Sequence, residues 1–163
     1  MINWFPGSLP FFEWCGRTWL GTTVRDTVWA FPVIETFHLL ALAVLLGTVL
    51  IVNLSAFGVG ARGSSSPVTA RELEPWMLTS LAVLILSGIP MAMSEPMKCY
   101  ESYSFPIKMI LLVVAILWHF TVQRRWTTPD ALRLTPLKSK LAAGFSILLW
   151  TGIGIAGKGI PYV

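Results

Sequence analysis

Charge is the scarcest property of this chain. Asp, Glu, Lys and Arg together make up only 12% of its 163 residues, whereas soluble globular domains carry about 25%. Hydrophobic residues account for 55%, and the mean hydropathy is +0.69. This balance excludes an ordinary soluble domain and indicates that the lipid bilayer is the solvent. The net charge of +4 does not indicate a nucleic-acid partner, because the basic residues gather in particular loops.

The motifs of most enzyme chemistry are also missing. The sequence has no Gly-rich phosphate loop, no nucleophile elbow and no Cys-x-x-Cys pair, and nothing in it resembles a hydrolase. The first residues lack a basic start and a clean apolar run, and they are interrupted by Pro6 and Pro10. We therefore expect no cleavable signal peptide.

Four long apolar stretches are present instead, each bounded by charge or by Pro and Gly. They lie at about 29–57, 75–93, 105–123 and 141–160. Each approaches or exceeds the roughly 20 residues that cross a bilayer as a helix. Residues 8–28 are rich in aromatic side chains and turn formers, and they are expected to lie in the interface as an amphipathic segment. The expected fold class is all-α, a single domain over residues 1–163 that forms an antiparallel four-helix transmembrane bundle with an N-terminal interfacial segment.

Lysine and arginine are unevenly distributed between the connections. The second connection carries Lys98 as its only basic residue, beside Glu95 and Glu101. The first and third connections carry Arg62, Arg71, Arg124, Arg125, Arg133, Lys138 and Lys140. Because short cytoplasmic loops are enriched in basic residues, we expect both termini and the second connection on the outer, periplasmic side of a bacterial inner membrane.

This orientation brings the only two cysteines, Cys15 and Cys99, to the same oxidising side of the membrane. A disulfide between them would tie the interfacial segment to the second connection. Two unpaired thiols are the alternative, and the sequence leaves both open.

Ionisable residues inside the spans are the most informative feature. Glu35 and His38 are three residues apart, so they share one face of the first helix. Such groups are costly in a membrane and usually mark a functional site. Lys108 and Lys158 fall in the same outer depth layer from two other spans. Two interpretations stay open: a binding site, or a structural ion pair of Glu35 with Lys108 or Lys158 that has His38 hydrogen-bonded beside it.

His119 is expected in the inner leaflet, close to the basic end of the third span. Histidines on two different spans favour a haem held between helices. However, His38 lies roughly 9 residues and His119 roughly 14 residues from the outer boundary, which gives an offset of at least about 8 Å. A haem bound through His38 alone, or through His38 with Lys108, fits better. For His119, an interfacial histidine bonded to a backbone carbonyl or to water is the alternative.

The second connection offers a different set of ligands. Met91, Met93, Met97 and Cys99 occur close together in "PMAMSEPMKC". Thioethers and thiolates are soft ligands that select Cu(I), which makes copper handling on the periplasmic side an alternative function. Methionine is also a common gap-filler in apolar cores, and this is the plainer interpretation.

Three stretches together carry a family resemblance: "VWAFPVIETFHLLALAVLLG", "SFPIKMILLVVAILWHF" and "LLWTGIGIAGKGIPY". They resemble a family of small bacterial four-helix membrane proteins of uncharacterised function, with W-x-[YF]-P-x-x-E-x-x-H in the first helix. More distantly, the chain is similar to CopD-type copper-resistance domains and to the four-helix haem-binding protoporphyrinogen oxidase. That similarity implies that His38 and Lys108 are the porphyrin-side pair and that His119 is a secondary candidate. The closer family usually has Asp-Leu-Arg after the first helix, where this chain has "NLSAFG".

The favoured function is a haem b-binding integral membrane subunit that takes part in electron transfer between a periplasmic donor and quinone. His38 would be the axial ligand, Lys108 a second ligand or a propionate partner, and Glu35 a tuning or proton-handling group. A non-catalytic accessory subunit of a larger membrane complex is the first alternative, and copper handling is the second. The sequence identifies no catalytic residue and leaves open whether the protein is an enzyme.

Overall fold

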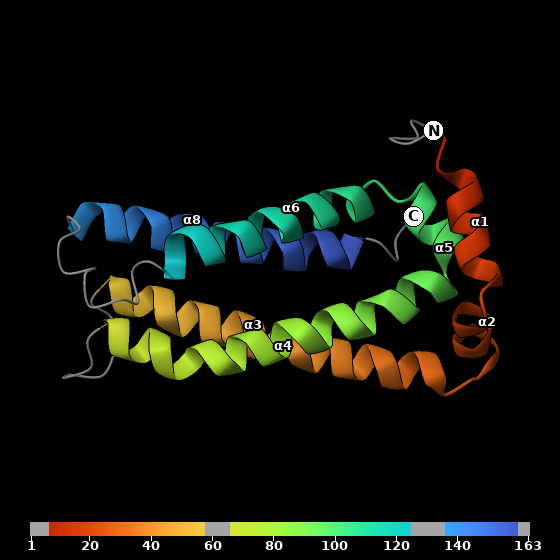
Figure 1. Ribbon diagram of the computed structural model, residues 1–163, viewed down its shortest axis with the longest axis horizontal. Helices are drawn as coiled ribbons and strands as arrows, with labels where there is room; N and C mark the ends of the chain where they lie inside the picture. The colour runs from red at the N-terminus through yellow and green to blue at the C-terminus, as the bar shows by residue number, and fades with distance from the viewer. Residues whose placement is uncertain (1–6, 58–65, 125–135, 160–163) are drawn as a thin grey trace.

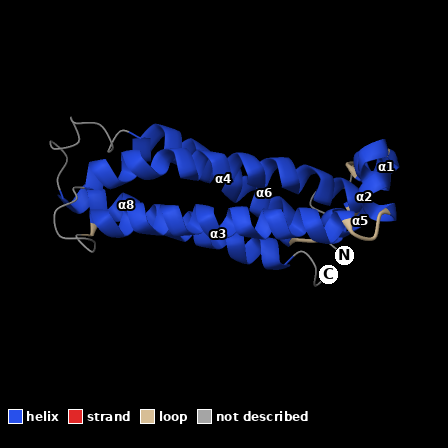
Figure 2. Cartoon of the chain, turned by 90° about the horizontal axis from the view of Figure 1, so that it is seen from below, coloured by secondary structure: helices blue, strands red, loops and turns tan. Residues whose placement is uncertain are grey.

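The computed structural model describes residues 7–57, 66–124 and 136–159, and these residues form helices without any strand (Figure 2). The long elements are α3 (Ala30–Ala56), α4 (Ser66–Ser94), α6 (Ser104–Trp118), which continues into the π-helical turn η1 (His119–Gln123), and α8 (Pro136–Gly159). The short helices are α1 (Leu9–Arg17), α2 (Trp19–Asp26) and α5 (Pro96–Glu101). Four helical segments are long and apolar enough to cross a membrane. The expected all-α membrane bundle is therefore confirmed.

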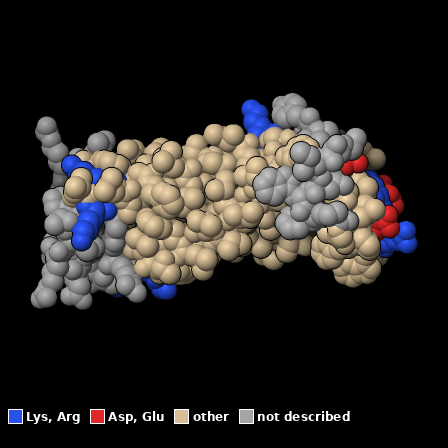
Figure 3. Space-filling view, turned by 90° about the horizontal axis from the view of Figure 1, so that it is seen from above, with Lys and Arg blue, Asp and Glu red and all other residues tan. Residues whose placement is uncertain are grey.

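The long helices run antiparallel in two pairs, with α3 along α4 and α6 along α8 (Figure 1). Helix α8 also packs against α3, whereas α4 and α6 hardly touch, so the side between α4 and α6 is the loosest of the bundle. Helices α1, α2 and α5 lie together across one end, which we call the cap end. The opposite end, where α3 finishes and α4 begins, is called the far end. On the face shown in Figure 3, charged side chains gather at both ends and most of the surface between them is uncharged.

Two span boundaries differ from the sequence prediction. Helix α4 begins at Ser66 rather than near 75, and Pro75 lies inside it. A proline removes one backbone hydrogen bond, but the turn before it is held by tertiary contacts, since Ala70 is buried and Glu74 is ion-paired. Helix α8 begins at Pro136, earlier than the predicted 141. The first and third spans agree closely with the prediction, and Ile160 lies outside the described residues.

The N-terminal segment predicted at 8–28 consists of two short helices. They are separated at Thr18, whose backbone is extended (ψ 151°) and whose hydroxyl accepts a hydrogen bond from the Gly21 amide at 3.3 Å. Trp14 and Trp19 are exposed, as expected for anchors in a membrane interface. A Cβ at position 21 would come within 2.5 Å of the Met93 carbonyl, so only glycine lets α2 approach the end of α4 this closely.

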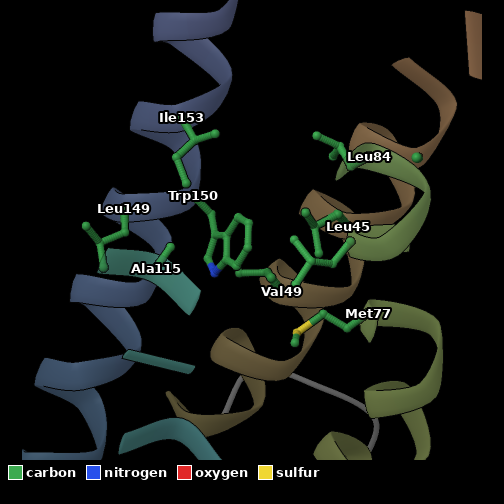
Figure 4. Close-up of a cluster of buried hydrophobic side chains, with 10 residues drawn as sticks. Leu45, Val49, Met77, Leu84, Ala115, Leu149, Trp150 and Ile153 are labelled. Carbon is green, nitrogen blue, oxygen red and sulfur yellow. The ribbon is translucent and has the colours of Figure 1, made fainter. Parts of the chain in front are cut away.

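An apolar cluster fills the middle of the bundle around Trp150 of α8, whose side chain is only 1% exposed (Figure 4). Leu45 and Val49 of α3 meet it from one side, and Ala115 of α6 is part of the same cluster. This cluster contains no ionisable side chain. It therefore separates the ionisable residues of the cap end from those of the far end.

Candidate functional site: a tethered histidine near the cap end

His38 is buried, and a serine on the neighbouring helix holds it in place. Its Nδ1 lies 2.8 Å from the Ser87 hydroxyl, which itself donates to the Val83 carbonyl at 2.6 Å. The ring also lies beside the Leu84 carbonyl, a group that can only accept a hydrogen bond. Because the single proton of Ser87 is already used, Nδ1 must donate. The tautomer is therefore fixed, and Nε2 keeps its lone pair, as in metal-bound histidines.

The next residue of α4 makes room for the imidazole. A Cβ at position 88 would lie 3.4 Å from Cε1 of His38, so Gly88 brings the backbone of α4 up to the ring. Ser87 and Gly88 thus act together, one as hydrogen-bond acceptor and the other as a flat contact surface. Small residues commonly allow helices to approach this closely in membranes.

Lys108 joins the same layer from α6. Its side chain lies along Gly157 of α8, where an added Cβ would come 3.3 Å from Nζ and 3.5 Å from Cε. Lys108 interacts electrostatically with both His38 and Cys99, so its side chain is near the His38 layer and near α5. The structure therefore brings together His38 and Lys108, the two residues that the sequence pairs.

The two other charged residues of this layer are placed differently. Glu35 is partly buried near the start of α3, and Lys158 is exposed near the end of α8. Within residues 7–57, 66–124 and 136–159, the ion pairs involve neither of these residues and do not involve Lys108. The structural ion pair considered as an alternative is therefore not formed.

His119 lies at the other end of the bundle. It is buried in the π-helical turn η1, where it lines a cavity of about 10 Å³ with Glu74 and Arg124. The Arg124 Nε lies 3.2 Å from a Glu74 oxygen. Along α4, Glu74 and the Ser87 that holds His38 are separated by about 20 Å at 1.5 Å per residue. The offset between the histidines is thus larger than the minimum derived from the sequence, and they cannot share one iron.

The residues of the copper alternative lie at the junction of α4 and α5. Met91 and Met93 end α4, and Met97 and Cys99 lie in α5. Within each pair the residues are two apart, so they project about 200° from one another around the helix. Accordingly, Met97 is exposed and Cys99 is buried. In the part of the chain that the structure describes, no three His, Cys, Asp or Glu side chains gather to hold a metal, and the copper hypothesis stays a prediction.

Cys15 and Cys99 are both buried, free thiols on the packed helices α1 and α5. Burial raises the pKa of Cys99 to about 11, although the nearby Lys108 charge opposes this shift. The thiolate is the reactive and metal-binding form of cysteine, so this thiol is held in its unreactive state at neutral pH.

The family of the chain follows from a comparison with known protein families. A model of DUF6644, a family of unknown function, matches residues 11–163. The chain belongs to this family. No curated protein and no solved structure matches it. The expected membership of an uncharacterised family is confirmed, whereas no match supports the more distant similarity to CopD-type domains or to the protoporphyrinogen oxidase.

The sequence of this DUF6644 chain singles out His38 and Lys108 as candidates, but it does not indicate the residues that contact them. Ser87 and Gly88 carry no motif, and their only signal is a pair of small residues in the span that follows the histidine. Gly157 belongs to a glycine-rich stretch that indicates close helix packing, but the sequence does not reveal that a lysine stem fills the space. The sequence does not indicate the Glu74–Arg124 pair, because Glu74 precedes the predicted start of the second span near residue 75 and no motif relates it to Arg124.

Proposed function

We propose that this protein is a haem b-binding integral membrane subunit that takes part in electron transfer between a periplasmic donor and quinone. The observation that carries the proposal is the tethering of His38: a buried imidazole whose Nδ1 is committed to Ser87 has only Nε2 to offer. The donor set fits haem iron, for which a histidine is the commonest protein ligand. When bound, a haem supplies a one-electron carrier inside the bilayer.

Each residue of the site has a role that follows from its position. His38 would hold the haem iron, and Ser87 would set the orientation of the ring and increase its basicity through the hydrogen bond at Nδ1. Lys108 places a positive charge in the same layer, where it either provides a second ligand or pairs with a propionate. Glu35, one helical turn before His38, tunes the charge of the layer or handles a proton.

The environment of the site follows from the distribution of charge. The basic connections favour a cytoplasmic far end, which places the cap end and both termini on the periplasmic side of a bacterial inner membrane. His38 then lies in the outer half of the bilayer, where a periplasmic donor reaches it over a short distance. The largely uncharged surface of the bundle leaves room for other membrane subunits beside the lipid.

An absorption spectrum tests the proposal most directly. The protein, purified in detergent from haem-sufficient cells, is measured oxidised and dithionite-reduced, with iron determined on the same sample. We expect a Soret band, reduced α and β bands, and about one iron per chain for a single axial histidine. A colourless, iron-free protein would contradict the proposal.

The two buried histidines form a matched pair of variants. His38→Ala should remove the pigment. His119→Ala is an equal truncation of a buried histidine at the far end of the bundle, and this variant should retain the pigment. Lys108→Ala should shift the spectrum or weaken haem retention. Full haem in His38→Ala would overturn the assignment of the ligand.

A non-catalytic accessory subunit of a larger membrane complex is the second candidate, and one observation favours it. Neither the cavity beside His119 nor a larger one at the cap end includes His38 in its lining. In this case the tethered histidine joins α3 to α4 and has no cofactor. The same spectrum separates the two candidates, because an accessory subunit of this kind is colourless.

A further inference from the structure

One cavity lies at the cap end, away from the residues that hold His38. It has a volume of about 180 Å³ and lies between α1, α5 and the first turns of α6. Most of its lining is apolar, with Phe12, Tyr100, Phe105 and Met109 among its residues. Neither the haem proposal nor the core uses this space.

One wall of the cavity belongs to the surface of a membrane-spanning helix. Met109 and Ile110 form part of its lining in the first turns of α6, and both side chains are largely exposed on the surface of a membrane span. The opposite wall belongs to α1, which lies across the end of the bundle. A molecule dissolved in the bilayer can therefore enter sideways at the depth of the membrane interface.

Aromatic rings give the cavity a preference for flat molecules. The Phe12 ring lies with its centroid 5.6 Å from that of Tyr100 and 6.2 Å from that of Phe105, both in inclined geometries. Such distances are typical of favourable ring contacts, and the flat ring of a bound ligand would add further contacts of the same kind. An apolar cavity of about 150 Å³ in another protein holds one benzene ring. The volume here thus fits one substituted six-membered ring, whereas a porphyrin is too large.

One buried hydroxyl supplies polar recognition. Ser102 lines the cavity with only 3% of its surface exposed, and its oxygen accepts a hydrogen bond from the Ser104 amide at 3.2 Å. The hydroxyl proton remains available for an oxygen of the ligand, since a serine can donate and accept together. Glu101 adds a carboxylate, and no Lys or Arg is among the described residues of the lining. This charge pattern disfavours the phosphate of a phospholipid headgroup.

From these features we infer that the cavity binds the headgroup of a membrane quinone. A quinone is flat, travels in the bilayer on an apolar tail, and carries carbonyl oxygens that accept a hydrogen bond from Ser102. This inference deepens the proposed function and rests on it for the redox use of the quinone, but binding itself requires no haem.

Photolabelling tests the site on the full chain. The protein in phosphatidylcholine nanodiscs is incubated with a short-tailed azido-ubiquinone, irradiated, digested and analysed by mass spectrometry. We expect saturable labelling confined to residues 8–17 and 100–110. Labelling spread over the lipid-facing surface, or labelling that phosphatidylethanolamine abolishes, would overturn the inference and, in the latter case, assign the cavity to lipid.

Matched variants on α6 sharpen the test. Met109→Trp fills the cavity and should abolish the saturable label, whereas Val113→Trp, an exposed residue one turn further along the same face, should leave it unchanged. Ser102→Ala should weaken binding roughly five- to tenfold through the lost hydrogen bond. Equal labelling of Met109→Trp and wild type would refute the site.

The photolabelling result is independent of whether the protein shows a haem spectrum. Quinone binding by a colourless protein would contradict only the haem proposal. A pigmented protein that does not bind the probe would contradict only this inference.

Discussion

The two halves of the bundle hold their histidines in different ways. His38 lies in the cap half on a regular helix, with its Nδ1 committed to Ser87 and its ring against Gly88. His119 lies in the far half on a π-helical turn, beside the Glu74–Arg124 ion pair. The first histidine has a tautomer fixed by a neutral hydroxyl, whereas the second lies beside an acid and a base that are paired with each other.

This difference indicates which histidine is suited to a ligand role. A metal ligand requires one defined nitrogen and a partner that fixes the ring, and the Ser87 contact supplies both for His38. π-Helical turns are frequent at functional sites, and here the turn η1 brings His119 next to the Glu74–Arg124 pair, which joins α4 to the end of the third span. The apolar cluster around Trp150 keeps the two ends apart, so each can be perturbed alone.

Disrupting the apolar cluster around Trp150 should cause the largest loss of stability. Trp150→Ala leaves a void among Leu45, Val49 and Ile153, and the free energy of unfolding should fall by about 3 kcal/mol. This is the lower end of the range for aromatic truncations, because lipid tails are as apolar as the core and only packing is lost. Unfolding by SDS in mixed micelles measures it.

Leu148→Ala provides the control for this core substitution. Leu148 lies on the same helix but is 72% exposed, so its truncation should change the free energy of unfolding by no more than about 0.5 kcal/mol. Equal losses in the two variants would show that the Trp150 cluster does not hold the halves together.

Much of this architecture was accessible from the sequence, because hydrophobicity and charge encode it directly. The first and third spans were predicted almost to the residue. The start of α4 was not, since Pro75 is a plausible first residue of a helix and only tertiary contacts of the preceding turns override that signal. The prediction of His38 with Lys108 rests on depth and on family resemblance. Ser87 and Gly157, which contact these two side chains, could not be predicted. A small residue in a sequence does not indicate which side chain it will contact until the positions of the helices are known.

Two serines of α4 provide a matched pair of substitutions in the cap half. Ser87→Ala removes the hydroxyl that accepts from His38, and the free energy of unfolding should fall by about 1 kcal/mol, since the Leu84 carbonyl remains beside the ring. Ser80→Ala, two turns away on the same helix, loses only a bond to the Met77 carbonyl and should cost less. In haem-loaded protein, the midpoint potential should shift for Ser87→Ala alone. An identical potential in both variants would remove Ser87 from the site.

Substitution of the Glu74–Arg124 pair in the far half should cause the smallest loss of stability, and this loss should depend on the salt concentration. Glu74→Gln removes one charge of the pair with Arg124, which is worth about 0.5 kcal/mol because the arginine is more than half exposed. In 1 M NaCl the Debye length falls to about 3 Å, so the difference from wild type should shrink. Glu72→Gln is the control, an exposed residue of the same helix that should show no such dependence. Neither substitution should alter the spectrum of the His38 site, and a spectral change in Glu74→Gln would show that the apolar cluster fails to separate the two ends.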